Sequence, residues 1–290
     1  MCAVLAQTAV PPISLRRRIT DHVMTGVAVL TVLIVLAPLF AIFAYLVYKG
    51  IGSINWAFLT QVPKPPGEPG GGMANAIVGS ILILGIASII GVPFGVGAGI
   101  YLAEFGRNRL GLFIRFTADV LNGVPSIVIG IVGWAILVRD RGFSALAGGV
   151  ALAIMMVPTI TRTTEEMLLL VPQALREAAY GLGIPRWRTT LSVTLRTATS
   201  GVITGIMLAF ARVAGETAPL LFTALGNDFW SLRLNQPTAA LPLQIYRYAL
   251  SPYDDFHRQA WAGSLVLIIL IVTAVAAVRY VVRRGTFGAA

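Results

Sequence analysis

The chain has 290 residues, of which 57% are hydrophobic and only 12% are charged, and its mean hydropathy is +0.82. Soluble domains carry about 25% charged residues, so this composition indicates a protein whose main solvent is lipid. The net charge of +10 does not point to nucleic acid, because the arginines stand at the ends of apolar runs and form no single basic face.

The sequence offers little that could hold a metal or form a disulfide. Its one cysteine, Cys2, has no second cysteine to pair with, and its two histidines, His22 and His257, lie far apart. We therefore expect no metal site and no other cofactor.

Six apolar stretches are long enough, or nearly so, to cross a bilayer, for which a helix needs about 20 residues. The first is preceded by Arg16, Arg17 and Arg18, as in an uncleaved first span and unlike a signal peptide. The sequence predicts an all-α polytopic membrane protein: a transmembrane domain over 23–282, between tails at 1–22 and 283–290. In chain order the six predicted spans are 23–48, 74–103, 112–138, 144–170, 192–224 and 259–282.

Lysines and arginines are distributed unevenly over the two sides of these spans. Thirteen lie in the N-terminal tail, the second loop, the segment around the fourth loop and the C-terminus, whereas seven lie in the longer loops opposite. Because cytoplasmic loops carry the excess of positive charge, we expect both termini to be cytoplasmic. The external loop around P-K-P-P-G-E-P-G-G-G should be irregular. The external segment 225–258 should include a short helix at the outer surface.

Several motifs of energy-converting and hydrolytic proteins are missing. A Walker A loop needs a lysine after a glycine, but the two lysines, Lys49 and Lys64, follow Tyr48 and Pro63. The sequence also lacks His-Glu-x-x-His and Gly-x-Ser-x-Gly. The string G-V-G-A-G at 95–99 is better explained by close helix packing than by phosphate binding. Energy for any transport must then come from an ion gradient or from a partner.

The segment 172–188 is polar and charged, although apolar runs flank it on both sides. After Pro172, Q-A-L-R-E-A-A-Y-G-L predicts a short helix, and Gly183-Ile184-Pro185 predicts a sharp turn. Such a helix could lie in a groove of a cytosolic partner, or it could be an ordinary amphipathic surface helix. The residues alone leave both readings open.

Glu177-Ala178-Ala179, followed by Gly183, resembles the E-A-A-x-x-x-G signature of the permease subunits of prokaryotic ABC importers. The resemblance implies the type I permease fold and makes 172–188 a coupling helix that docks in an ATPase subunit, with Arg176 among its coupling residues. The family pattern continues as I-x-L-P, which here reads V-T-L-R at 193–196. The missing proline affects how the next helix starts and leaves the docking half intact.

Four further strings resemble the phosphate-specific branch of these permeases, in the order expected for it. The resemblance implies inward transport of inorganic phosphate in a prokaryotic inner membrane, and no enzyme activity of the chain itself. It also implies a related permease as heterodimer partner, two ATPase subunits and an external phosphate-binding protein. The strings are G-G-M-A-N-A-I-V-G-S at 71–80, A-D-V-L-N-G-V-P-S-I-V-I-G at 118–130, T-R-T-T-E-E-M-L-L-L-V-P at 161–172 and A-R-V-A-G-E-T-A-P-L-L-F-T-A at 211–224.

Arg212 and Glu216 are candidate residues of the substrate pathway. They stand four residues apart, so on a continuous helix they would share one face. An arginine at the centre of a span costs about 2.5–3.5 kcal/mol on insertion scales, so it should face a cavity or a partner. A guanidinium binds two phosphate oxygens at once. Thr217 is assigned to the same pathway. The alternative is a structural ion pair between Arg212 and Glu216.

Other charged residues lie near the cytoplasmic ends of the third and fourth spans. Arg162 is a second candidate anion contact, with snorkelling to the interface as the alternative. Asp119 is expected to cap or position a kink near Asn122–Pro125, and Arg115 to anchor the interface. Glu165 and Glu166 are expected to be solvated or to contact the ATPase.

Two other functions are possible on the sequence alone. A permease for sulfate or molybdate would carry the same coupling signature. A secondary transporter that works without an ATPase would show paired internal repeats and broken helices in matching halves, and no such repeat is visible in the sequence.

Overall fold

The computed structural model describes residues 15–68 and 70–287, and of residues 283–287 only the backbone. The predicted tails therefore lie largely outside the described residues, and so does Cys2. The chain divides into two units, Met1–Tyr48 and Lys49–Ala290. The first contains most of helix α1 (Leu15–Gly50), which includes the predicted span 23–48. Pro38 lies inside this helix, as membrane helices tolerate.

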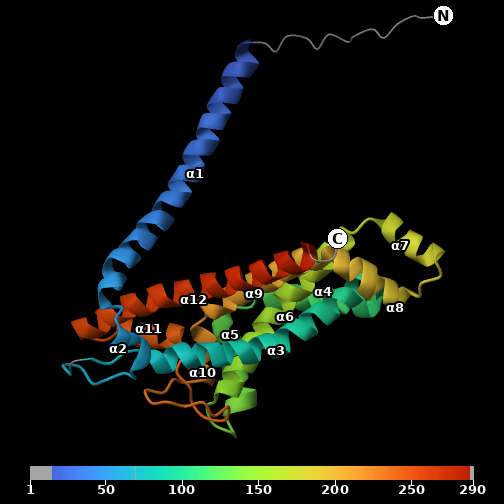
Figure 1. The fold of residues 1–290 in the computed structure, drawn as a ribbon. Helices are drawn as coiled ribbons and strands as arrows, with labels where there is room; N and C mark the ends of the chain where they lie inside the picture. The colour runs from blue at the N-terminus through green and yellow to red at the C-terminus, as the bar shows by residue number, and fades with distance from the viewer. Residues whose placement is uncertain (1–14, 69, 288–290) are drawn as a thin grey trace, which may run out of the picture. The chain divides into compact units, whose positions relative to one another are not determined.

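The second unit is helical and is drawn with its labels in Figure 1. Within the described ranges there is no β-strand, only an isolated bridge between Leu225 and Thr238. After the short turn η1 (Ile51–Ser53), its helices are α2 (Trp56–Thr60), α3 (Ala74–Phe105), α4 (Arg109–Gly123), α5 (Ser126–Gly133), the π-helix η2 (Trp134–Val138), α6 (Ala145–Leu169), α7 (Gln173–Gly181), α8 (Arg186–Thr189), the π-helix η3 (Thr190–Thr194), α9 (Leu195–Ala214), α10 (Ala218–Thr223), α11 (Leu241–Ala249) and α12 (Asp254–Phe287).

Helices α3 and α6 pack closely because one side of the contact is made of glycines. Three glycines spaced four apart on α3 lie against three larger residues of α6 with the same spacing. A Cβ at Gly95 would lie 2.7 Å from the Ile160 Cβ. The backbones can therefore approach as they do in small-residue membrane contacts. The opposing pairs are Gly91 with Met156, Gly95 with Ile160, and Gly99 with Thr164. This confirms the packing role expected for 95–99.

The third predicted span is not a straight helix. Helices α4 and α5 meet at a bend of 104°, at the break formed by Val124 and Pro125. Val124 is extended, as the residue before a proline usually is, and Pro125 has no N–H to continue the helix. The described residues thus contain five helices long and apolar enough to cross a membrane, and a sixth span if the bent pair counts as one.

The fifth predicted span ends earlier than the sequence indicated. A continuous helical stretch runs from Arg186 to Ala214, and α10 starts only at Ala218. The interruption has a local cause, since Gly215 has little helix propensity and Pro219 occupies the first turn of α10. The boundary predicted at residue 224 was therefore too late.

The segment 225–258 contains the short helix that the sequence predicted. This helix, α11, buries Leu241, Leu243 and Gln244 within the unit. It also packs beside α12, where the rings of Tyr248 and Phe256 stack with centroids 4.2 Å apart. The helix α11 is thus anchored in the core, whereas Phe229, Trp230 and Leu232 earlier in the segment are exposed.

Replacing Gly95 by valine should destabilise the bundle, because the added Cβ would overlap Ile160. Overpacking of this kind typically costs about 1–3 kcal/mol. Thermal unfolding of the detergent-purified protein should therefore show a lower midpoint. Gly97→Val is the matched control, because a Cβ at Gly97 on the same helix meets nothing within 4 Å. Equal losses in the two variants would contradict the packing argument.

Candidate functional site

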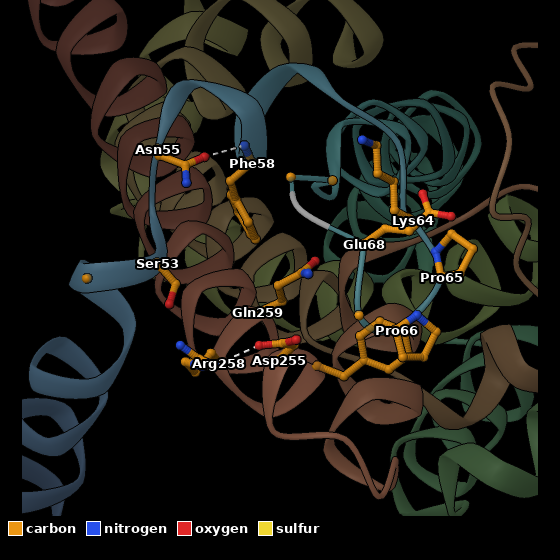
Figure 2. Close-up of a pocket in the computed structure, with 15 residues that line it drawn as sticks. Ser53, Asn55, Phe58, Lys64, Pro65, Pro66, Glu68, Asp255, Arg258 and Gln259 are labelled. Atoms are coloured by element: carbon orange, nitrogen blue, oxygen red, sulfur yellow. Dashed lines mark hydrogen bonds and ion pairs between the residues drawn. The ribbon is translucent and has the colours of Figure 1, made fainter.

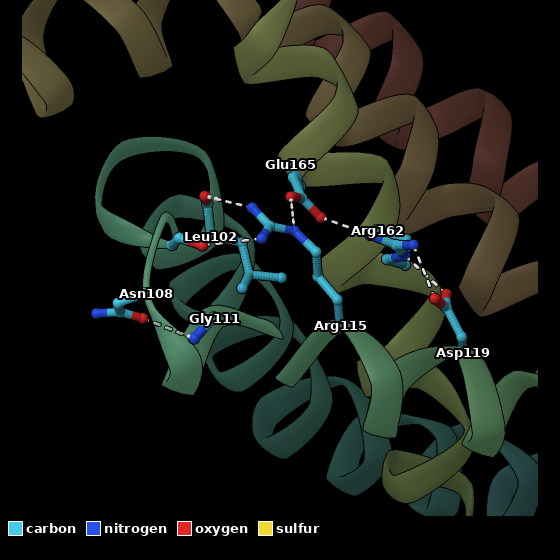
Figure 3. A network of polar contacts seen from close by, with 8 residues as sticks. Leu102, Asn108, Gly111, Arg115, Asp119, Arg162 and Glu165 are labelled. Carbon is cyan, nitrogen blue, oxygen red and sulfur yellow. Dashed lines mark hydrogen bonds and ion pairs between the residues drawn. The ribbon is translucent and has the colours of Figure 1, made fainter. Parts of the chain in front are cut away.

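Four charged side chains form a chain of ion pairs between α4 and α6, drawn in Figure 3. We call Arg115, Glu165, Arg162 and Asp119 the four-residue network. Glu165 is 4% exposed and accepts from both arginines: Arg115 Nε lies 2.6 Å from Oε1, and Arg162 Nη1 lies 2.9 Å from Oε2. The second carboxylate, Asp119, accepts two hydrogen bonds from Arg162: Nε lies 2.8 Å from Oδ1, and Nη2 lies 2.9 Å from Oδ2.

Arg115 also connects this network to the end of α3. Its two terminal nitrogens donate to the backbone oxygens of Gly106, at 2.8 Å, and Leu102, at 3.1 Å. Leu102 lies in the last turn of α3 and Gly106 directly follows the helix, and the Leu102 carbonyl also accepts from the Gly106 N–H. One guanidinium therefore holds α3, α4 and α6 together.

The sequence predictions for these charges need correction at several points. Glu165 is buried between two guanidinium groups, so it is not a solvated residue, whereas Glu166 is exposed. Arg115 is a contact within the chain, and not only an interface anchor. Asp119 pairs with Arg162 and makes no cap at the α4–α5 bend. The spacing could have suggested part of this, since Arg162 and Glu165 stand one helical turn apart.

The predicted coupling helix is present as α7, and Gly183 explains how it ends. Gly183 has a φ of +77°, a left-handed conformation that suits glycine. Its N–H bonds to the oxygen of Tyr180, and the N–H of Ile184 bonds to the oxygen of Ala179. This pair of bonds is the Schellman motif, which satisfies the last carbonyls of a helix.

The side chains of α7 divide into an exposed and a buried set. Glu177 and Ala178 are exposed, while Ala179 lies on the buried face of α7. Beyond them Leu182 is 81% exposed and Trp187 is 64% exposed. Exposed apolar residues beside a helix of this kind indicate a surface that another molecule covers.

Arg176 turns away from this exposed set and makes two bonds within the chain. Its Nη1 lies 2.5 Å from Glu104 Oε1, and its Nη2 lies 2.6 Å from the oxygen of Leu168. The Arg176 side chain is 15% exposed and that of Glu104 is 8% exposed. Sequence reasoning missed Glu104, although a lone acid at the end of an apolar run was a signal that it has a partner.

The candidate pathway residues lie at the break between α9 and α10. Arg212 is on the last turn of α9, whereas Glu216 and Thr217 lie beyond its end. The premise that Arg212 and Glu216 share one helical face is therefore wrong. Within the part of the chain that the structure describes, the exposed Arg212 guanidinium makes no hydrogen bond or ion pair, and Glu216 and Thr217 are half-buried.

A polar hollow of about 400 Å³ lies at the other end of the second unit, where α12 begins (Figure 2). Its lining includes Lys64 and Glu68 from the loop before α3, and Asp255, Arg258 and Gln259 from α12. Arg258 donates to Asp255 at 2.7 Å. The sequence predicted no site here. Among residues 15–68 and 70–287 no group of three or more His, Cys, Asp or Glu could hold a metal ion.

The fold defines a polytopic membrane component with a short helix set at one end of its spans. It resembles a chain of the inward-facing MetNI methionine ABC transporter with a TM-score of 0.59, at 18% sequence identity, over 72% of this chain and 97% of the other. Residues 95–286 match the model of the family described as "Binding-protein-dependent transport system inner membrane component". The chain belongs to this family, and the predicted fold class is confirmed.

Named relatives in this family are closely similar over most of their length. The chain is 46% identical to the phosphate transport system permease protein PstA of Yersinia pestis, over 88% of each chain. The PstA protein of Haemophilus influenzae is 44% identical, over 88% of this chain and 91% of its own. PstA 1 of Mycobacterium tuberculosis strain H37Rv is 35% identical, over 94% and 92%. The predicted family resemblance is confirmed.

Removing the charge of Glu165 should destabilise the contact between α4 and α6. Glu165→Gln leaves two arginines without their shared carboxylate, and breaking a buried pair can cost about 3–5 kcal/mol. Both arginines are about one-third exposed, so we expect a loss below that range. Thermal unfolding should show it. Glu166→Gln, at an exposed neighbour, should leave the midpoint unchanged, and similar losses in both would contradict the role of Glu165.

Replacing Gly183 by alanine should loosen the end of α7, because alanine disfavours the left-handed backbone at this position by about 1 kcal/mol. Hydrogen exchange of the amides of 178–184 should become faster. Gly181→Ala is the control, since Gly181 lies within α7 and has open space around its Cβ position. That variant should exchange no faster than wild type. Unchanged exchange in Gly183→Ala would contradict the capping role.

Proposed function

We propose that this chain is a transmembrane permease subunit of an ABC importer that moves inorganic phosphate into the cell. A second, related permease completes the pathway, two separate subunits hydrolyse ATP, and an external phosphate-binding protein delivers the substrate. The named relatives support this proposal, because their printed names assign them to phosphate transport. This chain itself has no Walker A sequence with which to bind ATP.

The observation that most directly supports an anionic substrate is the unpaired guanidinium of Arg212. Arg115, Arg162 and Arg176 each bond to a carboxylate of the chain, whereas Arg212 has no such partner in the described residues. An unpaired charge in a membrane helix is costly unless it faces water, a partner or a substrate. Phosphate supplies oxygens at the spacing that the guanidinium fork binds.

Glu216 and Thr217 complete this pathway in our proposal. Both lie in the break between α9 and α10, and the N–H of Glu216 bonds to the oxygen of Val213, which keeps Glu216 close to the helix that carries Arg212. A carboxylate near the anion repels it, which lets phosphate leave after it has been bound. The Thr217 hydroxyl can donate a hydrogen bond to a phosphate oxygen.

Arg162 is the second proposed anion contact, in a different state of the transporter. Here its guanidinium is occupied by Asp119 and Glu165. Asp119 is the more exposed of these two carboxylates, so it is the one that phosphate can replace. A contact of Arg162 with phosphate then requires that the α4–α6 pair opens at this point.

The α7 end of the bundle faces the cytoplasm in this proposal, and both termini lie on the same side. The exposed residues Glu177 and Ala178 enter a groove of the ATPase subunit, in the manner of a helix that docks between partner elements. The polar hollow at the start of α12 then faces outward, toward the binding protein.

Another tetrahedral oxyanion, such as sulfate or molybdate, fits the same guanidinium fork. Competition decides between them: phosphate uptake by the assembled transporter should resist an excess of sulfate or molybdate. A transporter that works without an ATPase is separated by purification, since an ABC permease retains its ATPase chain and a secondary carrier has none.

Arg212→Ala should weaken phosphate uptake at low phosphate concentration while leaving the complex assembled. Loss of a hydrogen bond to a charged group costs about 1.5–3 kcal/mol, which corresponds to roughly a tenfold to hundredfold loss of affinity. The test measures uptake in proteoliposomes that contain the whole transporter, with subunit stoichiometry and ATPase activity followed in the same samples. Arg196→Ala, at an exposed arginine of the same helix, should transport normally. If Arg212→Ala prevents assembly, Arg212 instead pairs with another subunit.

A further inference from the structure

We propose that Arg176 is a positioning residue that ties the coupling helix α7 rigidly to the ends of α3 and α6. Movement of α7 is thereby passed to the spans. This inference rests on the proposed function, because it assumes that an ATPase moves α7. It assigns Arg176 to a contact within the permease, and leaves the exposed Glu177 and Ala178 to make the contact with the ATPase.

The covalent connections of α7 are poorly suited to transmit force. On one side the chain leaves α6 through Leu170 and Val171 and reaches α7 only after Pro172, which interrupts helical hydrogen bonding. On the other side Gly183 has a φ of +77°, and Pro185 separates α7 from α8. Although α7 also packs against η3, turns at both ends would let it move without moving α3 and α6, unless a side chain fixes it to them.

Arg176 provides such a fixed contact, since it bonds to two different helices at once. Nη1 reaches the Glu104 carboxylate on the last turn of α3 at 2.5 Å, and Nη2 reaches the Leu168 carbonyl near the end of α6 at 2.6 Å. Both partners of the ion pair are largely buried, so solvent and salt weaken it little. Charge-assisted bonds of this length are stronger than bonds between neutral groups.

The end of α3 is held from a second direction. The carbonyls of Leu102 and Gly106, on either side of Glu104, accept from Arg115 of α4. Arg115 in turn bonds to Glu165 of α6. We call residues 102–106 the α3 end. A displacement of α7 is therefore passed through Arg176 to the α3 end, and from there through Arg115 to α4 and α6.

This arrangement separates docking from transmission, which makes it testable. Loss of the ion pair should leave the ATPase bound, because the exposed face of α7 is unchanged. It should reduce the phosphate moved per ATP hydrolysed. A residue that merely stabilises the fold would lower assembly, ATPase activity and uptake together, and would leave their ratio as it was.

The experiment compares Glu104→Gln, Arg176→Gln and the double variant with wild type in proteoliposomes that contain the complete transporter. We expect the ATPase to copurify normally and the ratio of phosphate uptake to ATP hydrolysis to fall about fivefold or more in each single variant. The double variant should be no worse than Arg176→Gln alone, because the ion pair with Glu104 is already absent there. An unchanged ratio, or parallel loss of assembly and activity, would overturn the proposal.

A second readout does not depend on the substrate and uses the same purified complex. Spin labels at the exposed positions Leu182, after α7, and Leu110, on α4, report how firmly α7 is held. In a complex with Cys2 and the partner cysteines removed, the distance distribution should be narrow in wild type and broad in Glu104→Gln. If wild type moves no phosphate but the distance distribution still broadens in Glu104→Gln, phosphate is not the substrate, and the role of the Arg176–Glu104 contact is upheld. If the distribution in Glu104→Gln is the same as in wild type, the Arg176–Glu104 contact does not hold α7 in place.

Discussion

The close contact of α3 with α6 is the constraint on which the rest of the second unit depends. With Gly91, Gly95 and Gly99 on one side, the two backbones approach more closely than they could across larger side chains. Helix α6 is thereby placed at the centre, where its other faces contact α4, α9 and α10. Residues from α3, α6, α9 and α10 then share one core, which includes Ile83, Ile160, Val213 and Leu220 among its buried members. Lipid cannot drive helices together as water does, so this packing and the polar contacts must supply the association energy.

The polar contacts gather where α3 and α6 end, close to α7. Arginines of other elements add hydrogen bonds to carbonyls at these helix ends while neutralising two buried carboxylates, Glu104 and Glu165. A buried ion pair adds little net stability compared with apolar packing, but it fixes which groups must meet. The glycine contact thus brings the helices together, and the arginines determine how their ends are aligned.

Much of the architecture could be predicted because hydrophobicity and a few turn residues determine it. Long apolar runs predicted the spans, and Pro172, Gly183 and Pro185 predicted where α7 begins and ends. The partners of the charges could not be predicted in the same way. Glu104 and Arg176 are 72 residues apart, and Arg162 and Asp119 are 43 apart, so their pairing depends on how helices pack. The Arg212–Glu216 premise failed for a local reason, since α9 ends at Ala214 and α10 starts only at Ala218, which leaves Glu216 in the break between them.

Both interrupted spans place a short helix, α5 or α10, beyond their break, and these two short helices pack together. A Cβ at Gly130 of α5 would lie 2.9 Å from the Cα of Pro219 in α10, so the two backbones are nearly in contact. Neither short helix can shift far without displacing the other. Glu216 is bonded through its N–H to the oxygen of Val213 in α9, whereas Thr217 directly precedes α10. The break between α9 and α10 is therefore linked, through α5, to the bend at Pro125 in a different part of the chain.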